Sequence, residues 1–330
     1  MEALSPAQRE LVRRVYFENE KITDIAREEG VDKSAISHRL DRIYKKMKKL
    51  GALLLACVLS FSLVGCGGDD KTPTSNGDTT NVSGKITLDG STSMEKLVKG
   101  LAEAIKEDYP NLTLEPQFTG SGTGIKSVIA GTANIGNSSR ALKDEEKAEG
   151  LVENIVALDG IAVIVDKNNS IKNLTKQQLA DIYTGKVKNW KEVGGADQNI
   201  VVVGREEGSG TRDGFEDILG IKEKCKYANT LNETGAVVAK VEGTPGAIGY
   251  ASLDVAEDSK DKVNILSLDN IVPSESTILD GTYTLQRPFV MATKGEINKQ
   301  SEQVQAVFKF IESAKGQEVI KSVGLVVPNK

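Results

Sequence analysis

The chain has 330 residues, 39% hydrophobic and 27% charged, which is enough for a buried core and for more than one domain. Its formal net charge of −5 gives it no overall basic field for nucleic acid. The only histidine is His38, so the large C-terminal part lacks the imidazole of a Ser-His-Asp triad, a histidine metal cluster or a histidine acid–base pair. We therefore expect no enzyme, no cofactor and no metal site.

Residues 1–46 are helical in pattern and rich in lysine and arginine. Ala26, Gly30 and Ile36 have the spacing of a small residue at a helix crossing, a turn glycine and an apolar anchor. The segment resembles the helix-turn-helix of the promoter-reading region of sigma factors and would form a small all-α unit. The residues that would then face a DNA groove are Lys33, Ser34, Ser37, His38 and Arg39. The alternative is a helical hairpin with a solvated, charged face.

The apolar run "GALLLACVLSFSLV", residues 51–64, follows the positively charged "MKKL". It is shorter than the roughly 20 residues of a membrane-spanning helix and fits the roughly 7–15 residues of a signal-peptide core. Leu63-Val64-Gly65-Cys66 then resembles the bacterial lipobox, in which the cysteine carries the lipid. The alternative is a buried core helix.

We predict a lipoprotein signal peptide over residues 47–66, lipidation of Cys66 and a flexible tether over residues 67–83. The protein would then be held by lipid on the extracytoplasmic face of the cell membrane. Met47 could be the natural start of the secreted protein, in which case residues 1–46 are an extension or a fusion.

From residue 84 onward, strand and helix patterns alternate, which predicts an α/β fold. The apolar run "NIVALDGIAVIVD" has Asp159 at its middle. The segment "LTKQQLADIYTG" is typical of a helix, since Thr175 and Gln178 fit a capping box and Gly185 fits a C-cap.

Three of the predicted strand-to-helix joints share one format. They are "GSTS" (Gly90–Ser93), "GSGTG" (Gly120–Gly124) and "GSGT" (Gly208–Thr211). A helix start offers free backbone amides and a positive dipole end, glycine lets an anion approach, and hydroxyls add donors. One such joint is usually only a helix cap. Three in one domain, together with Arg140 and Arg205, predict a shared site for a tetrahedral oxyanion.

Residues from about 85 to 330 resemble the PstS-like family, the phosphate-binding proteins of bacterial ABC importers. The stretches that carry the resemblance are "DGSTSMEKLV", "FTGSGTGIKSVIAGTANIGNSSRAL", "ALDGIAVIVD", "LTKQQLADIYTGKVKNW", "VVVGREEGSGTRDGF" and "GAIGY". The resemblance implies a type II periplasmic-binding-protein fold over residues 84–330, with two α/β lobes and hinge strands. Lobe 1 would comprise about 84–159 and 249–330, and lobe 2 about 160–248.

The resemblance also implies the phosphate-binding residues. They are Thr92, Ser93 and Ser121 from one lobe and Arg205, Ser209, Gly210 and Thr211 from the other. Glu207 matches an acidic position that would pair with Arg205. Family members accept a hydrogen bond from phosphate with an aspartate at the position of Ser139, which is a departure here. We therefore expect Asp159 to be the acceptor, with Arg140 also close to the anion.

The expected function is capture of phosphate for an ABC permease by a monomeric, lipid-anchored binding protein. One alternative keeps the fold but changes the ligand to sulfate or molybdate. Another is a membrane-tethered regulator, in which a DNA-binding helix-turn-helix is joined to an external anion sensor.

Overall fold

The computed structural model describes residues 11, 22–32, 35–36, 39 and 81–328, and the chain divides into two units, Met1–Ser75 and Asn76–Lys330. In the first unit, α2 (Ile22–Glu28) ends before Gly30, whose φ of 66° makes the expected turn. Ile25, Ala26 and Ile36 are buried. None of the helices in these described ranges is both long enough and apolar enough to cross a bilayer.

Most of the predicted DNA contacts lie outside the described residues: Lys33, Ser34, Ser37 and His38. Arg39 is exposed and forms an ion pair with Glu29. The predicted signal peptide, the lipidated Cys66 and most of the tether also lie outside the described residues.

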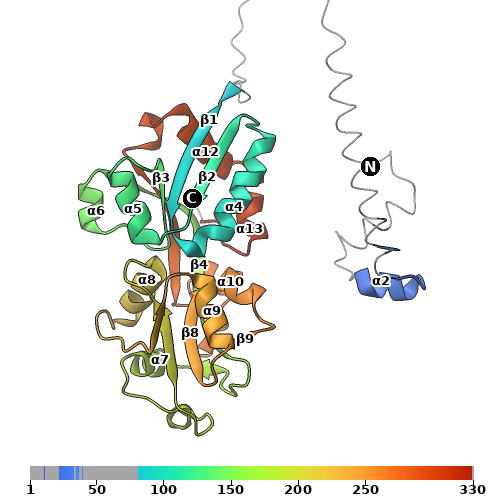
Figure 1. Ribbon diagram of the computed structural model, residues 1–330, viewed down its shortest axis with the longest axis vertical. Coiled ribbons are helices and arrows are strands. Elements are labelled where there is room, and N and C mark those ends of the chain that lie inside the picture. Colours follow the sequence, from blue (N-terminus) through green and yellow to red (C-terminus); the bar gives the residue numbers. More distant parts are fainter. Residues whose placement is uncertain (1–10, 12–21, 33–34, 37–38, 40–80, 329–330) are drawn as a thin grey trace, which may run out of the picture. The chain divides into compact units, whose positions relative to one another are not determined.

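The second unit has the predicted two-lobed α/β fold (Figure 1). The strands of the first lobe are β1 (Gly84–Gly90), β2 (Leu112–Gln117), β3 (Ile135–Ser138) and β10 (Gln286–Lys294). Its helices are η3 (Thr92–Met94), α4 (Glu95–Ala104), η4 (Ile105–Glu107), α5 (Ser121–Ile129), α6 (Asp144–Ala148), η6 (Ile297–Lys299), α12 (Glu302–Glu312) and α13 (Ala314–Ser322). The sheet runs β2-β1-β3-β10 and continues into β4 (Leu151–Asp166).

The first lobe buries both faces of this sheet. Side chains alternate between the faces of a strand, so β10 contributes Phe289 and Met291 to one core and Val290 and Ala292 to another. The first core also holds residues of α4, α12 and α13, and the second holds residues of α5. Apolar residues on both faces therefore fix the strand between two helical layers.

The second lobe contains the remaining strands, β5 (Asn173–Leu174), β6 (Val201–Arg205), β7 (Asn229–Leu231), β8 (Ala247–Ser252) and β9 (Val263–Leu268). Its helices are α7 (Lys176–Tyr183), η5 (Trp190–Val193), α8 (Gly210–Leu219), α9 (Thr234–Glu242), α10 (Leu253–Asp258) and α11 (Glu275–Leu279). The predicted capping box of α7 is present, with Thr175 and Gln178 bonded to each other's backbone amides.

Strand β4 serves both lobes. Its residues 151–160 pair antiparallel with β10, and its residues 161–166 pair with β8 and β9. Figure 1 shows β4 at the junction of the lobes. The long apolar run around Asp159 is thus one continuous strand.

The second lobe is longer than the sequence analysis expected. Tyr250, Leu266 and Leu285 all belong to its core, although the expected lobe ended at residue 248. The reason is pairing: β8 and β9 join the second half of β4 and not the strands of the first lobe. The chain returns to the first lobe with β10, at Gln286.

Candidate functional site

Seven hydroxyl side chains from both lobes meet at the lobe junction, and we call them the hydroxyl cluster. They are Ser91, Thr92, Ser93, Ser121, Ser139, Thr211 and Thr234, and all are buried. Ser93 Oγ lies 2.7 Å from Thr211 Oγ1 and 3.1 Å from Thr234 Oγ1, which links the two lobes directly. Within the first lobe, Ser91 Oγ donates to Ser139 Oγ over 2.8 Å.

Glycines bring the first lobe's hydroxyls together. A Cβ at Gly124 would lie 2.2 Å from the carbonyl oxygen of Asp89, and one at Gly90 would lie 2.1 Å from that of Asn137. Gly90 also has a φ of 142°, which favours glycine. The helix α5 therefore packs backbone to backbone on β1, and Ser121 at its first position is held beside Ser139, with 3.3 Å between the hydroxyl oxygens.

The start of α8 reaches the cluster from the second lobe. A Cβ at Gly210 would lie 2.3 Å from Ser121 Oγ and 2.7 Å from Ser139 Oγ, so only glycine fits there. Ser209 caps the helix by accepting from the backbone amide of Arg212. Gly122 N donates to Gly208 O over 2.9 Å, which adds a backbone bond between the lobes.

Arg205 is the buried cation of the site, with 1% of its surface exposed. Its Nη1 donates to Thr234 Oγ1 over 3.0 Å. Its other guanidinium nitrogens donate to both carboxylate oxygens of Glu206 and to the carbonyls of Leu231 and Asn232. The guanidinium plane is thus fixed with one edge toward the hydroxyl cluster.

Glu206, and not the predicted Glu207, pairs with Arg205. Glu207 is exposed. The two acids are adjacent in sequence, so motif spacing alone could not tell which one turns inward. The backbone leaves β6 at Arg205, and only Glu206 lies close enough to form the two-oxygen contact.

Thr234 is a site residue that the sequence analysis missed. It begins α9 directly after β7, in the stretch "TLNETG", which repeats the strand, hydroxyl and helix format of the three predicted joints. Thr234 bonds Thr92, Ser93 and Arg205. Four helix starts, those of η3, α5, α8 and α9, therefore contribute hydroxyls to one place.

Arg140 does not join the hydroxyl cluster, contrary to expectation. Its Nη1 and Nη2 donate to Glu146 over 2.8 and 2.7 Å, and its Nε donates to Asp213 over 2.9 Å. Because Asp213 lies on α8, this contact is an ion pair between the lobes. The three contacts with carboxylates occupy the Arg140 guanidinium, which therefore does not point toward the predicted anion site.

Asp159 is also placed differently from the prediction. Its Oδ2 accepts from Nε and Nη2 of Arg287 at 3.0 and 2.8 Å, and its Oδ1 accepts from Leu253 N at 3.3 Å. Arg287 in turn donates to the carbonyl of Ser139. The carboxylate therefore lies behind the cluster and bonds none of its hydroxyls. Arg287 was invisible to sequence reasoning because it lies 128 residues from Asp159.

Burial dominates the electrostatics of this pair. It raises the pKa of the Asp159 carboxyl to about 7, although the neighbouring Arg287 guanidinium opposes the shift. The nearby carboxyl of Asp254, itself 3% exposed, also raises the pKa of Asp159.

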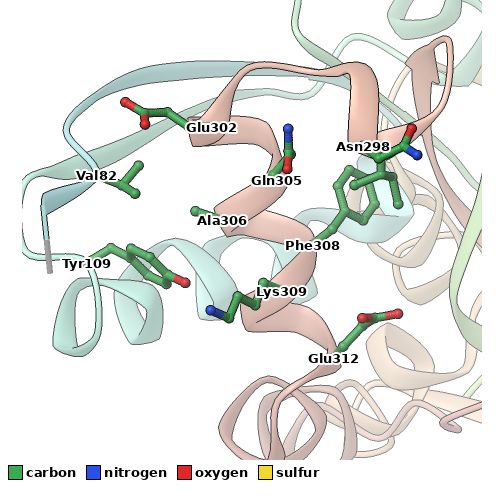
Figure 2. Close-up of a pocket in the computed structure, with 10 residues that line it drawn as sticks. Val82, Tyr109, Asn298, Glu302, Gln305, Ala306, Phe308, Lys309 and Glu312 are labelled. Carbon is green, nitrogen blue, oxygen red and sulfur yellow. The ribbon is translucent and has the colours of Figure 1, made fainter. Parts of the chain in front are cut away.

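A separate pocket of about 470 Å³ lies on the first lobe, and Figure 2 shows it beside α12. Its lining includes Val82, Tyr109 and Phe308. It contains no residue of the hydroxyl cluster and no charged residue predicted for the anion site.

Comparison with known proteins agrees with this architecture. The family model described as "PBP superfamily domain" matches residues 74–315. The chain is similar to the "Phosphate-binding protein PstS" of Bacillus subtilis, at 34% identity over 292 residues, covering 84% of this chain and 92% of that protein.

Two solved structures are also similar. A putative phosphate ABC transporter substrate-binding protein from Clostridium perfringens, with bound phosphate, is 37% identical with a TM-score of 0.69. An ABC-type phosphate transport receptor from Vibrio cholerae is 31% identical with a TM-score of 0.63. Each match covers 74% of this chain and 100% of the other. The chain therefore belongs to the PBP superfamily and, within it, to the family of the phosphate-binding proteins PstS.

Proposed function

We propose that this protein captures inorganic phosphate between its lobes and delivers it to an ABC permease, without changing any covalent bond of the ligand. The observation that carries the proposal is the meeting of four helix starts, their hydroxyls and the Arg205 guanidinium at the lobe junction. Backbone amides, hydroxyls and arginine together suit a tetrahedral anion. The bound phosphate of the Clostridium perfringens relative supports the choice of ligand.

Binding requires the lobes to part. The hydroxyls of Ser93 and Thr211 now bond each other, so an anion that takes both donors must replace that bond. We therefore propose that Thr92, Ser93, Ser121, Ser139, Ser209, Gly210 and Thr211 contact phosphate with Arg205, and that Thr234 joins them.

Calorimetric titration of phosphate-free, full-length protein tests the proposal. The wild-type protein should bind phosphate, and Thr211→Ala should weaken binding by roughly tenfold to a hundredfold because one buried donor is lost. Ser276→Ala, on the exposed side of α11, is the matched control and should bind as the wild type does. Absence of phosphate binding by the folded wild type would refute the function.

We also propose that the mature protein is a monomer held outside the cytoplasm by a lipid on Cys66. The lipobox-like sequence before Cys66 supports this. Cys66→Ser should release the protein from membranes, whereas Cys225→Ser, at a half-buried thiol in the second lobe, should not. Intact mass of the membrane-extracted protein would show whether the chain begins at a lipidated cysteine.

For the N-terminal unit, DNA binding stays a prediction. The left-handed Gly30 after α2 and the buried Ile25, Ala26 and Ile36 fit a helix-turn-helix. Fluorescence anisotropy of the uncleaved chain with duplex DNA would test it. Salt-independent or absent binding would argue against a groove-binding role.

A further inference from the structure

The hydroxyl cluster lacks any bonded carboxylate. Among residues 81–328, each hydroxyl of the cluster bonds another hydroxyl, a backbone group or the Arg205 guanidinium. The composition of the site therefore decides which protonation states of an anion it can accept.

Four carboxylates on the strands and helices around the cluster, those of Asp89, Asp159, Glu206 and Asp213, are engaged by other groups. Both oxygens of Asp89 accept from Thr119 and Ser127. Asp159 Oδ2 accepts from Arg287 and Oδ1 accepts from Leu253 N. Both oxygens of Glu206 accept from the Arg205 guanidinium. Asp213 on α8 pairs with Arg140 and Lys143. The charges of Asp159, Glu206 and Asp213 are thus compensated by arginines, and the carboxylate of Asp89 is held by two hydroxyl donors.

A hydroxyl and a carboxylate differ in what they can accept. An ionised carboxylate only accepts hydrogen bonds, so it favours an anion that still carries a proton and repels one that does not. A serine hydroxyl donates or accepts by rotating its proton. It can bond a protonated phosphate oxygen or a bare sulfate oxygen equally.

Ser139 is the position where this difference matters most. Its hydroxyl lies between Ser91 and Ser121, against the backbone of Gly210 at the start of α8. Its backbone amide donates to Ser121 and its carbonyl accepts from Arg287, so the residue is fixed while its hydroxyl proton stays free to rotate.

We infer that the site accepts tetrahedral oxyanions as a class, sulfate together with phosphate, and that Ser139 is the residue that permits both. This inference rests on the proposed function, because it assumes that the hydroxyl cluster is the anion site.

Calorimetry of the phosphate-free, full-length protein at about pH 8, where phosphate is mainly a dianion, tests the inference. Sulfate should bind with a Kd within about a hundredfold of that of phosphate, since the two ligands differ by one hydrogen bond at most. Ser139→Asp should weaken sulfate at least about tenfold more than phosphate, because it places an acceptor-only group at the site. Ser139→Ala is the control and should weaken both anions by a similar factor.

The outcomes separate the inference from the function on which it rests. Strong phosphate binding with sulfate more than about a hundredfold weaker overturns the inference and leaves the function standing. An unchanged anion ratio in folded Ser139→Asp also overturns it. Binding of sulfate without phosphate, or of neither anion, refutes the proposed function. If circular dichroism shows that Ser139→Asp is unfolded, Ser121→Asp places the same charge beside Gly210.

Discussion

The two lobes hold their parts of the site in different ways. In the first lobe, glycines let α5 pack on the backbone of β1, and the hydroxyl side chains lie at the first residues of the helices. In the second lobe, a polar and aromatic network surrounds Arg205. Tyr250 Oη accepts from Arg205 N, and Tyr227 Oη donates to Glu216.

This difference indicates which substitutions each lobe tolerates. At Gly90 and Gly124 of the first lobe, backbone packing leaves no room for even one methyl group, whereas the side-chain network around Arg205 can lose a hydrogen bond and keep its shape. Between the two lies the buried Asp159–Arg287 pair, which belongs to the strands that join them.

The largest expected effect comes from breaking that buried pair. Asp159→Ala should lower the free energy of unfolding by about 3–5 kcal/mol, because Arg287 would remain buried without a counter-charge. Chemical denaturation measures the loss. Asp159→Leu with Arg287→Met should recover most of it, since apolar replacement of both partners removes the unpaired charge. A double variant no more stable than Asp159→Ala would contradict this reasoning.

Next comes the glycine packing of the first lobe. Gly124→Ala should cost about 1–3 kcal/mol or more, because its Cβ would lie 2.2 Å from Asp89 O. Gly235→Ala in α9 is the matched control in the second lobe, where a Cβ meets nothing within 4 Å. The control should be neutral or stabilising by up to about 1 kcal/mol. Similar losses in both variants would show that the close approach of α5 to β1 is not what makes Gly124 sensitive.

The side-chain network of the second lobe should be more tolerant. Tyr227→Phe removes the hydroxyl that lies 2.9 Å from Glu216 and 3.2 Å from Tyr250. We expect a loss of about 0.5–1.5 kcal/mol in denaturation. Tyr109→Phe, in the first lobe, should have a smaller effect than this. A loss for Tyr109→Phe as large as that for Tyr227→Phe would show that the effect does not come from the hydrogen-bonded network of the second lobe.

The smallest effect concerns pH and the bridge made by Arg140. Burial raises the pKa of the Glu146 carboxyl, but hydrogen bonds from Arg140 and Lys143 outweigh burial and hold the pKa below its usual value. The folded state therefore binds fewer protons than the unfolded state as pH falls through this range, so the stabilisation is present near neutral pH and is lost in acid. Glu146→Gln should cost up to about 1 kcal/mol at pH 7 and less at about pH 3.

Glu145→Gln, at the exposed neighbouring position on α6, is the control for this last experiment. A difference between Glu146→Gln and wild type that stays constant or grows as the pH falls would contradict the sign given above.

Local patterns predicted much of the fold. The capping box of α7 and the apolar β4 depend on neighbouring residues, so spacing was sufficient to predict them. The repeated strand-to-helix format likewise predicted three of the four hydroxyl-bearing joints. Two kinds of contact could not be predicted: those between residues far apart in the sequence, and those for which two adjacent residues are equally suitable partners. Arg287 meets Asp159 only through β-pairing, and the choice of Glu206 over Glu207 depends on the direction in which the backbone leaves β6.

The continuity of β4 through both lobes also affects how the protein unfolds. One half of the strand is hydrogen-bonded into each lobe, and its buried residues include Ala157 in one core and Ile164 in the other. In the first lobe β4 is the outermost strand beside β10, and in the second it lies between β8 and β9. Melting either lobe would therefore remove from the other a strand that carries core residues, so neither lobe is stable without its partner. Heating should therefore give a single cooperative endotherm for residues 81–328. Movement between the lobes must come from bending β4 and the second crossing at Leu285–Gln286, and not from separating independent folding units.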